Sequence, residues 1–392
     1  MLHPFSYWSD IAMTSLEKIK ELVQFNTVSR DSNLPLIDHI AAYLDDLGIE
    51  SHRVESADGK KSNLYASVGP NEPGGVVLSG HTDVVPTDGQ DWHTDPFAPE
   101  VKENCLYGRG TCDMKGFIGT ALALVPEMDS LIKPIHFALS YDEEVGCKGA
   151  PGMIAEISQT IPKPEAVIVG EPTQMKAITG HKGMVTLTTS ILGFEAHSSQ
   201  THRGVSAVMT AAKLVEKLNS MATELAEHTS IDTGFEPHHS TIHVGIIRGG
   251  TAINIISRHC EFQWDIRCIP NDDPKIIIDA FEKYCRDEVL PNMQGISNDC
   301  GIKTEIMASA PAFLMSESPA MALLASLGTQ PTEKHAPYVA EAGQFQAAGF
   351  PTVVCGPGSI DQAHKPNEFI ALDQIDQGEH LLRKLIARLS NP

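Results

Sequence analysis

Six side chains that could bind metal ions or move protons follow apolar or glycine-rich segments of the chain. They are His81, Asp113, Glu143, Glu144, Glu171 and His364. Four carboxylates crowded at one site would repel one another, and divalent cations would remove that repulsion. Two histidines and three carboxylates can hold two Zn²⁺ ions, with one histidine for each ion and one carboxylate bridging them. One glutamate then remains as a general base toward water and a proton donor to a leaving amine.

The hypothesis of a two-metal site depends on all of these groups occurring together, because each acidic residue alone is more typical of a helix cap or a surface charge. Glu143 and Glu144 alone would be a solvated turn. His81 follows the apolar run 76–78, and Asp83 lies two residues further, on the same side of an extended chain. Asp83 is therefore a candidate to hold the second imidazole nitrogen of His81.

Other motifs near these residues have weaker interpretations. Cys112 lies beside Asp113 and could be a thiolate ligand, but a packed cysteine is favoured because adjacent side chains usually diverge. Gly108 and Gly110 resemble part of a dinucleotide-binding loop, yet position 113 is aspartate and the pattern fails. The sequence contains no Walker A, HExxH or GxSxG motif.

Buried strands alternating with helices must position these groups. Short apolar runs at 76–78, 135–140, 166–170 and 351–356 predict buried strands, each followed by acidic, imidazole or glycine residues. A first helix is expected to start at Thr14, with Glu17 completing a capping box. This alternation predicts an α/β domain with a mostly parallel sheet and helices on both faces. In such sheets ligands gather at the carboxyl ends of the strands.

The pattern of apolar and polar residues is different between residues 181 and 296. Residues 184–191, 241–247 and 260–267 alternate apolar and polar side chains, which indicates half-buried strands, and two longer helical patterns accompany them. We therefore expect a catalytic domain over 1–180 and 297–392, interrupted by an inserted α+β domain over 181–296 with helices on one sheet face.

The composition and net charge of the chain argue against several functional classes. The 392 residues carry a net charge of −21, which argues against nucleic acid and anionic membranes as partners. No apolar run has the roughly 18–20 residues of a membrane span, and residues 1–8 lack the pattern of a signal peptide. The eight cysteines show no CxxC or disulfide-framework spacing, so we expect reduced thiols and a cytoplasmic protein.

The chain resembles the dinuclear-zinc amidohydrolase family, which includes deacetylases, desuccinylases, aminoacylases and glutamate carboxypeptidases. The matching segments are 80–86 (GHTDVVP), 108–116 (GRGTCDMKG), 142–146 (DEEVG), 170–173 (GEPT), 196–199 (AHSS), 249–256 (GGTAINII), 265–267 (DIR) and 363–369 (AHKPNEF). They cover essentially the whole chain in order.

The resemblance implies two metal sites that share one ligand. His81, Asp113 and Glu171 would hold one metal, and Asp113, Glu144 and His364 the other, with Asp113 bridging. The expected ions are two Zn²⁺, for which Co²⁺ or another divalent ion could substitute.

The resemblance also implies roles around the metals. Glu143 would be the general base and acid, Asp83 would orient His81, and the peptide bond after Asp113 would be cis. His197 would be a lid histidine that stabilises the oxyanion, usually in the site of the other subunit.

The resemblance implies two substrate contacts, and the sequence itself adds expectations about two glycines and the oligomeric state. Arg267 and Asn254 would contact a substrate carboxylate. Gly356 and Gly358 would let substrate approach the backbone. The inserted domain would act as a lid and form a homodimer through an exposed strand edge.

The substrate is expected to be a small N-acyl amino acid. Residues 340–368 are most similar to the branch of the family that deacetylates N²-acetyl-L-ornithine in arginine biosynthesis, and Glu341 is a candidate to bind the substrate ammonium group. Succinyl-diaminopimelate, another N-acyl amino acid or a dipeptide are the alternatives. A non-catalytic binding protein on this scaffold would have lost the base or a metal ligand, and here none is missing.

Overall fold

The computed structural model describes residues 13–230, 232–315 and 318–391. The segment 1–8, in which no signal-peptide pattern was found, lies outside this range. The chain divides into two compact units. The first runs to Thr179 and also includes Met315–Thr332 and Ala340–Pro392; the second comprises Gly180–Leu314 and Glu333–Val339.

A six-stranded sheet forms the centre of the first unit. Its strands, in spatial order, are β1 (Ser51–Glu55), β2 (Ser62–Val68), β6 (Ile135–Ser140), β3 (Val76–His81), β7 (Ala166–Val169) and β14 (Thr352–Val354). Strands β6, β3, β7 and β14 are parallel, whereas β1 and β2 are antiparallel to their neighbours. Every residue of β3, β6 and β7 is buried, which explains their continuous apolar sequences. The expected mostly parallel sheet is confirmed.

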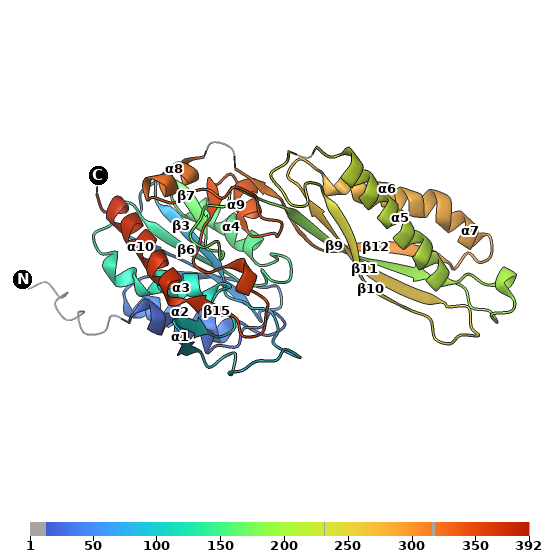
Figure 1. Cartoon of the computed structure of the whole chain (residues 1–392), viewed down its shortest axis with the longest axis horizontal. Helices are drawn as coiled ribbons and strands as arrows, with labels where there is room; N and C mark the ends of the chain where they lie inside the picture. The colour runs from blue at the N-terminus through green and yellow to red at the C-terminus, as the bar shows by residue number, and fades with distance from the viewer. Residues whose placement is uncertain (1–12, 231, 316–317, 392) are drawn as a thin grey trace, which may run out of the picture. The chain divides into compact units, whose positions relative to one another are not determined.

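Helices cover both faces of this sheet, as expected (Figure 1). They are α1 (Ser15–Val23), α2 (Leu34–Asp46), α3 (Lys115–Ala123), α4 (Ala150–Thr160), α8 (Pro319–Ser326), α9 (Ala342–Ala347) and α10 (Leu372–Leu389). Successive residues of β3 face opposite sides. Gly80 lies against Ile118 of α3, whereas the Ser79 hydroxyl donates to Glu341 at the start of α9. The predicted capping box at Thr14 and Glu17 is present.

Shorter elements complete the first unit. A three-stranded sheet contains β15 (Phe369–Ala371), β5 (Cys105–Tyr107) and β4 (Glu100–Lys102). Two 3₁₀ turns are Val125–Glu127 and Ile360–Gln362. Pairing between β15 and β5 connects the segment after His364 with the segment before Asp113.

The second unit contains a four-stranded antiparallel sheet. Its order is β10 (Thr241–Gly249), β11 (His259–Cys268), β9 (Gly183–Leu192) and β12 (Gly301–Ala310). Alternate residues of β11 are buried, so one face forms a core with α5 (Ala207–His228) and α6 (Pro274–Tyr284). A π-helical turn (Cys285–Val289), α7 (Leu290–Gln294), the 3₁₀ turn Thr201–Arg203 and the β8–β13 pair (Gly180–His181, Phe313–Leu314) complete the unit. This is the α+β arrangement that the alternating strands predicted.

The boundaries of this unit differ from the expected 181–296. The first change of unit falls after Thr179, close to expectation, but the second falls after Leu314. The reason is β12, which pairs along β9 and therefore belongs to the second sheet. Residues 333–339 also join this unit, where Lys182 donates its backbone N–H to Ala336.

Two further observations concern the chain as a whole. Among the described residues, no helix combines the length and apolar character needed to cross a membrane. All eight cysteines are free thiols, and seven of them are buried.

Candidate metal centre

Parallel strands bring the acidic and imidazole groups to one edge of the first sheet. His81 is the last residue of β3, Glu143 and Glu144 follow β6, and Glu171 follows β7. Because β3 pairs in parallel with both β6 and β7, these three carboxyl ends are neighbours. Asp113 enters from the turn before α3.

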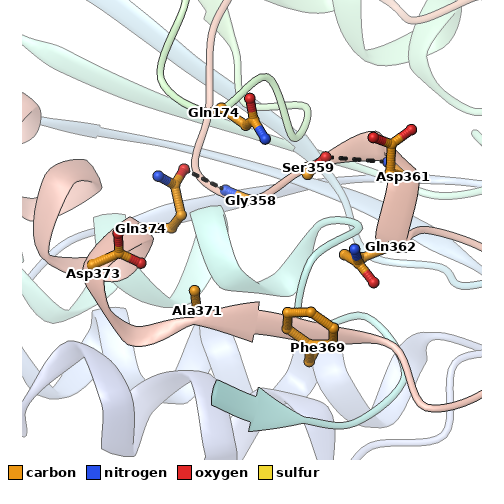
Figure 2. Close-up of a pocket in the computed structure, with 9 residues that line it drawn as sticks. All are labelled: Gln174, Gly358, Ser359, Asp361, Gln362, Phe369, Ala371, Asp373 and Gln374. Carbon is orange, nitrogen blue, oxygen red and sulfur yellow. Dashed lines mark hydrogen bonds between the residues drawn. The ribbon is translucent and has the colours of Figure 1, made fainter. Parts of the chain in front are cut away.

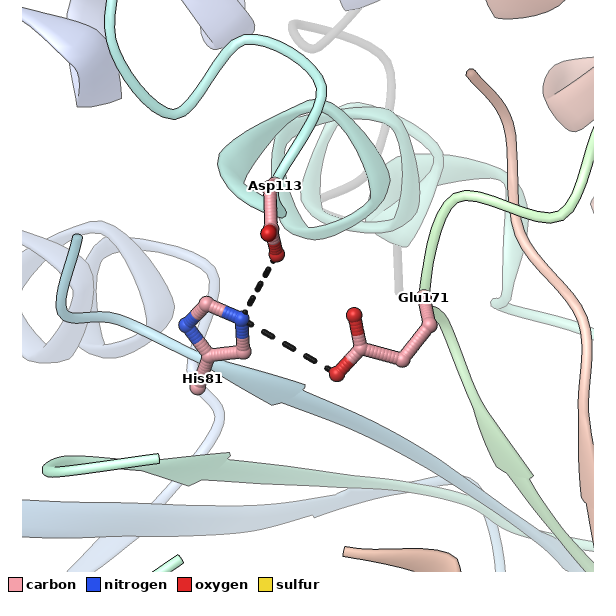
Figure 3. A group of neighbouring side chains, drawn as sticks. All are labelled: His81, Asp113 and Glu171. Carbon is pink, nitrogen blue, oxygen red and sulfur yellow. Dashed lines mark hydrogen bonds and ion pairs between the residues drawn. The ribbon is translucent and has the colours of Figure 1, made fainter. Parts of the chain in front are cut away.

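Three buried side chains form the first ligand group (Figure 3). The Nε2 atom of His81 lies 2.9 Å from Oδ1 of Asp113 and 3.9 Å from Oε1 of Glu171. The second group contains His364, whose Nε2 lies 2.9 Å from Oε2 of Glu144 and 3.3 Å from Oδ2 of Asp113. Each oxygen of Asp113 thus faces a different histidine, which is the arrangement of a bridging carboxylate.

The electrostatics of this cluster fit a pair of divalent cations. Burial raises the pKa of Glu144 to about 7 and that of Glu171 well above its usual value. Hydrogen bonds to Asp113 and Glu144 raise the pKa of His364 to about 10. Acidic side chains therefore outnumber the imidazoles in this cluster, and Oε1 of Glu144 is buried without a hydrogen-bond partner among the described residues. Imidazole nitrogens and carboxylate oxygens are ligands that suit divalent zinc.

Asp83 contacts this site through two different groups. Its backbone carbonyl oxygen lies 2.9 Å from Nδ1 of His81, closer than its Oδ1 at 3.7 Å. A proton on Nδ1 donated to this carbonyl leaves Nε2 of His81 free to bind a metal. The Asp83 carboxylate instead accepts hydrogen bonds from the backbone N–H groups of Glu143 (3.1 Å) and Glu144 (3.3 Å) and from the Ser29 hydroxyl (2.7 Å). Asp83 therefore fixes both His81 and the turn that carries the two glutamates.

Glu143 lies beside the ligands but belongs to neither group. Its burial raises its pKa to about 8. The Cys147 thiol donates a hydrogen bond to Oε1 of Glu143 at 3.2 Å. This contact could not be predicted from the sequence, because Cys147 carries no signal beyond being one of several reduced thiols.

The segment around Asp113 has two further features that were expected from the sequence. The peptide bond between Asp113 and Met114 is cis, as the resemblance implied. Cys112 is buried, donates its thiol hydrogen to the Ser359 carbonyl oxygen and belongs to neither ligand group, which agrees with a packed cysteine.

Gly356 is close to the candidate metal ligands for a reason of packing. A Cβ at this position would lie 2.1 Å from the carbonyl oxygen of Gly170 and 2.7 Å from that of Glu171. Only glycine allows the end of β14 to approach the residues that present Glu171. Glu341, the candidate for a substrate ammonium group, is also inside the domain, 1% exposed beside Ser79. Its burial raises its pKa to about 7.

The remaining predicted residues belong to the second unit. His197 is exposed, and its Nδ1 accepts hydrogen bonds from the Ser199 hydroxyl and backbone N–H. The loop of His197 is held next to Asn254, whose carbonyl oxygen accepts from the N–H of Ser198 at 3.0 Å. Arg267 lies on β11 with its Nε 3.4 Å from Oδ1 of Asp265.

A pocket of about 340 Å³ lies in the first unit (Figure 2). Its lining is polar and comprises Gln174, Gly358, Ser359, Asp361, Gln362, Phe369, Ala371, Asp373 and Gln374. None of the metal-ligand candidates lines it, so the pocket is separate from the metal centre. The expected role of Gly358 in substrate approach gains no support from this location.

Residues 77–388 match the model of peptidase family M20/M25/M40. An acetylornithine deacetylase of Myxococcus xanthus is 32% identical over 380 residues, covering 94% of this chain and 96% of that protein. An acetylornithine deacetylase of Pasteurella multocida is 33% identical and covers 91% of both chains.

Solved structures share the fold at lower identity. An M20 family metallo-carboxypeptidase from Sulfolobus solfataricus has a TM-score of 0.75 at 18% identity, covering 96% of this chain and 99% of that one. A dinuclear metal-binding peptidase of the M20 family from Bacillus subtilis has a TM-score of 0.64 at 14% identity, covering 95% and 97%.

Proposed function

Because this chain belongs to peptidase family M20/M25/M40, we propose that it is a two-metal amidohydrolase that converts N²-acetyl-L-ornithine to L-ornithine and acetate. The observation that carries the proposal is the shared position of Asp113 between two ligand groups. The substrate follows from relatives named acetylornithine deacetylase that align over nearly the whole chain. The free cysteines agree with a cytoplasmic location, which is part of the proposal.

The proposed metals are two Zn²⁺ ions. His81, Asp113 and Glu171 would hold one, and Asp113, Glu144 and His364 the other. When bound, the ions polarise the acetyl carbonyl and make water a better nucleophile near neutral pH.

The chain's own residues then move the proton and hold the substrate. Glu143 takes a proton from water and returns it to the leaving amine nitrogen. His197 donates a hydrogen bond to the oxyanion, and Arg267 and Asn254 bind the substrate carboxylate. Gly356 supplies backbone that the substrate can approach closely.

Assays of metal-loaded protein test this function. We expect kcat/KM for N²-acetyl-L-ornithine to exceed that for succinyl-diaminopimelate and other short N-acyl amino acids by on the order of 10–100-fold, since pocket contacts discriminate on this scale. Preference for another acyl amino acid or a dipeptide would replace the substrate assignment but keep the reaction class. The absence of amide hydrolysis across the whole panel would refute the enzyme itself.

We also propose a homodimer formed through the second unit. Strand β10 is an edge strand with mostly exposed residues, including Ile246 and Ile247. An exposed apolar edge can pair with its copy and continue the sheet.

The variant Ile247→Lys tests this interface. A charge at a paired edge should weaken the dimer at least about tenfold, or ~1.4 kcal/mol, as measured by light scattering over a concentration series. Ile276→Lys is the matched control, because Ile276 is an exposed isoleucine on α6 of the same unit. Equal masses for wild type and both variants would argue against this edge.

A further inference from the structure

Glu368 accepts hydrogen bonds from several backbone N–H groups of the segment that ends in Asp113. Its side chain is 1% exposed, and Oε1 accepts hydrogen bonds from the N–H groups of Cys112 (2.8 Å) and Asp113 (3.0 Å). Both carboxylate oxygens also lie 3.1 Å from the N–H of Gly110. One side chain, four residues after His364, therefore fixes the approach to the carboxylate shared by the two ligand groups.

Arg109 and Gln90 extend this network back to His364. Arg109 Nη1 lies 2.7 Å from Oε2 of Glu368, and Nη2 donates to Oε1 of Gln90 at 2.6 Å. The amide Nε2 of Gln90 donates to the backbone carbonyl oxygen of His364 at 3.0 Å. The Arg109 guanidinium also lies over the Trp92 ring, 5.1 Å from its centroid. A continuous chain of hydrogen bonds thus joins Asp113 to His364 by a route that contains no metal ligand side chain.

We propose that Glu368, Arg109 and Gln90 are positioning residues that set the separation of Asp113 and His364, and thereby the retention of the metal that these two ligands share. The inference rests on the proposed function, since it takes the two ligand groups as metal sites. None of these three residues belongs to either group.

The energetics favour a positioning role over a contribution to stability alone. Glu368 and Arg109 are both 1% exposed, and a buried ion pair gains little net stability once its desolvation is counted. Several N–H donors directed at one carboxylate instead hold the backbone in a single geometry. Such precision matters at Asp113, because its side chain belongs to both candidate ligand groups and its two oxygens would each serve one of them.

Substitutions at the two ends of this hydrogen-bond network should have different effects on the bound metals. Gln90 contacts the backbone of His364, a ligand in only one group, so its loss should affect one metal. Glu368 fixes Asp113, which is a ligand in both groups, so its loss should affect both metals. A residue that merely stabilised the fold would not separate the two metals in this way.

The experiment follows zinc release from the full-length, zinc-loaded protein into excess chromogenic chelator. Gln90→Ala should release one of the two ions about 10–100-fold faster than wild type and the other ion at the wild-type rate. This factor is the usual effect of removing a residue that supports a metal ligand. Glu368→Gln should accelerate the release of both. Asp91→Ala is the control, because Asp91 is the next residue along the chain, its side chain is exposed, and its backbone carbonyl oxygen accepts a hydrogen bond from the Asn367 amide, which the substitution leaves in place.

The outcomes separate this inference from the proposed function. Gln90 is partly exposed, so Gln90→Ala should fold, and its zinc release can decide the question even if Glu368→Gln does not fold. The inference alone is overturned if the wild-type protein binds two ions and Gln90→Ala releases both of them as slowly as Asp91→Ala does. It is also overturned if Gln90→Ala releases both ions faster by the same factor. Wild-type protein that binds no divalent ion overturns the proposed function as well.

Discussion

Glu143→Gln is expected to lower kcat by about 10²–10⁴-fold while both metals stay bound. The factor is the usual contribution of a positioned general base, and glutamine cannot accept the proton. Glu143 is outside both ligand groups, so the variant should keep its metal content. Steady-state kinetics with N²-acetyl-L-ornithine and elemental analysis of the purified variant measure the two quantities.

Asp142→Asn is the matched control for this prediction. Asp142 is in the same turn, but its carboxylate pairs with Lys61. Its φ of 57° is one that asparagine adopts readily. We expect turnover close to that of wild type. If Glu143→Gln retained similar turnover, Glu143 would have no role in proton transfer.

The strands that position the site could be predicted from the sequence because each is short, apolar and followed by a chemically distinctive residue. The run 76–78 led directly to β3 and His81, and the runs before Glu143 and Glu171 led to β6 and β7. Parallel pairing then requires their ends to meet. The approach of Asp113 and His364 depends on the turn before α3 and the loop after β14, and here the family resemblance supplied what periodicity could not.

The strand β12 shows where the sequence pattern failed. Its pairing with β9 shifts register between Ile306 and Ala308. An irregularity of this kind interrupts the alternation of apolar and polar residues on which strand prediction depends. The second unit was therefore expected to end at residue 296 rather than at Leu314.

Contacts around the ligands were hidden for a different reason. The Asp83 carboxylate binds backbone N–H groups 60 and 61 residues away, and Glu368 binds the N–H of Asp113 across 255 residues. Backbone N–H groups are present at every residue except proline, so no residue type marks such a partner in the sequence. Supporting contacts of this kind become visible only once the fold is known.

The shared carboxylate gives the second large prediction, which concerns Asp113→Asn. Its two oxygens face His81 and His364, so this variant should lose both metals together. We expect affinity for each ion to fall by more than about 100-fold, beyond the loss typical of residues that only support a ligand. Isothermal titration of the metal-free protein with Zn²⁺ measures the number of ions bound and their affinities.

Glu171→Gln and Glu144→Gln are the comparison variants for this titration. Each of these glutamates belongs to one ligand group only, so each variant should still bind one ion tightly. Both are also carboxylate-to-amide changes at a buried site, which matches the chemical change in Asp113→Asn. A single tightly bound ion in Asp113→Asn, as in these two variants, would mean that Asp113 serves one metal and that the two groups do not share it.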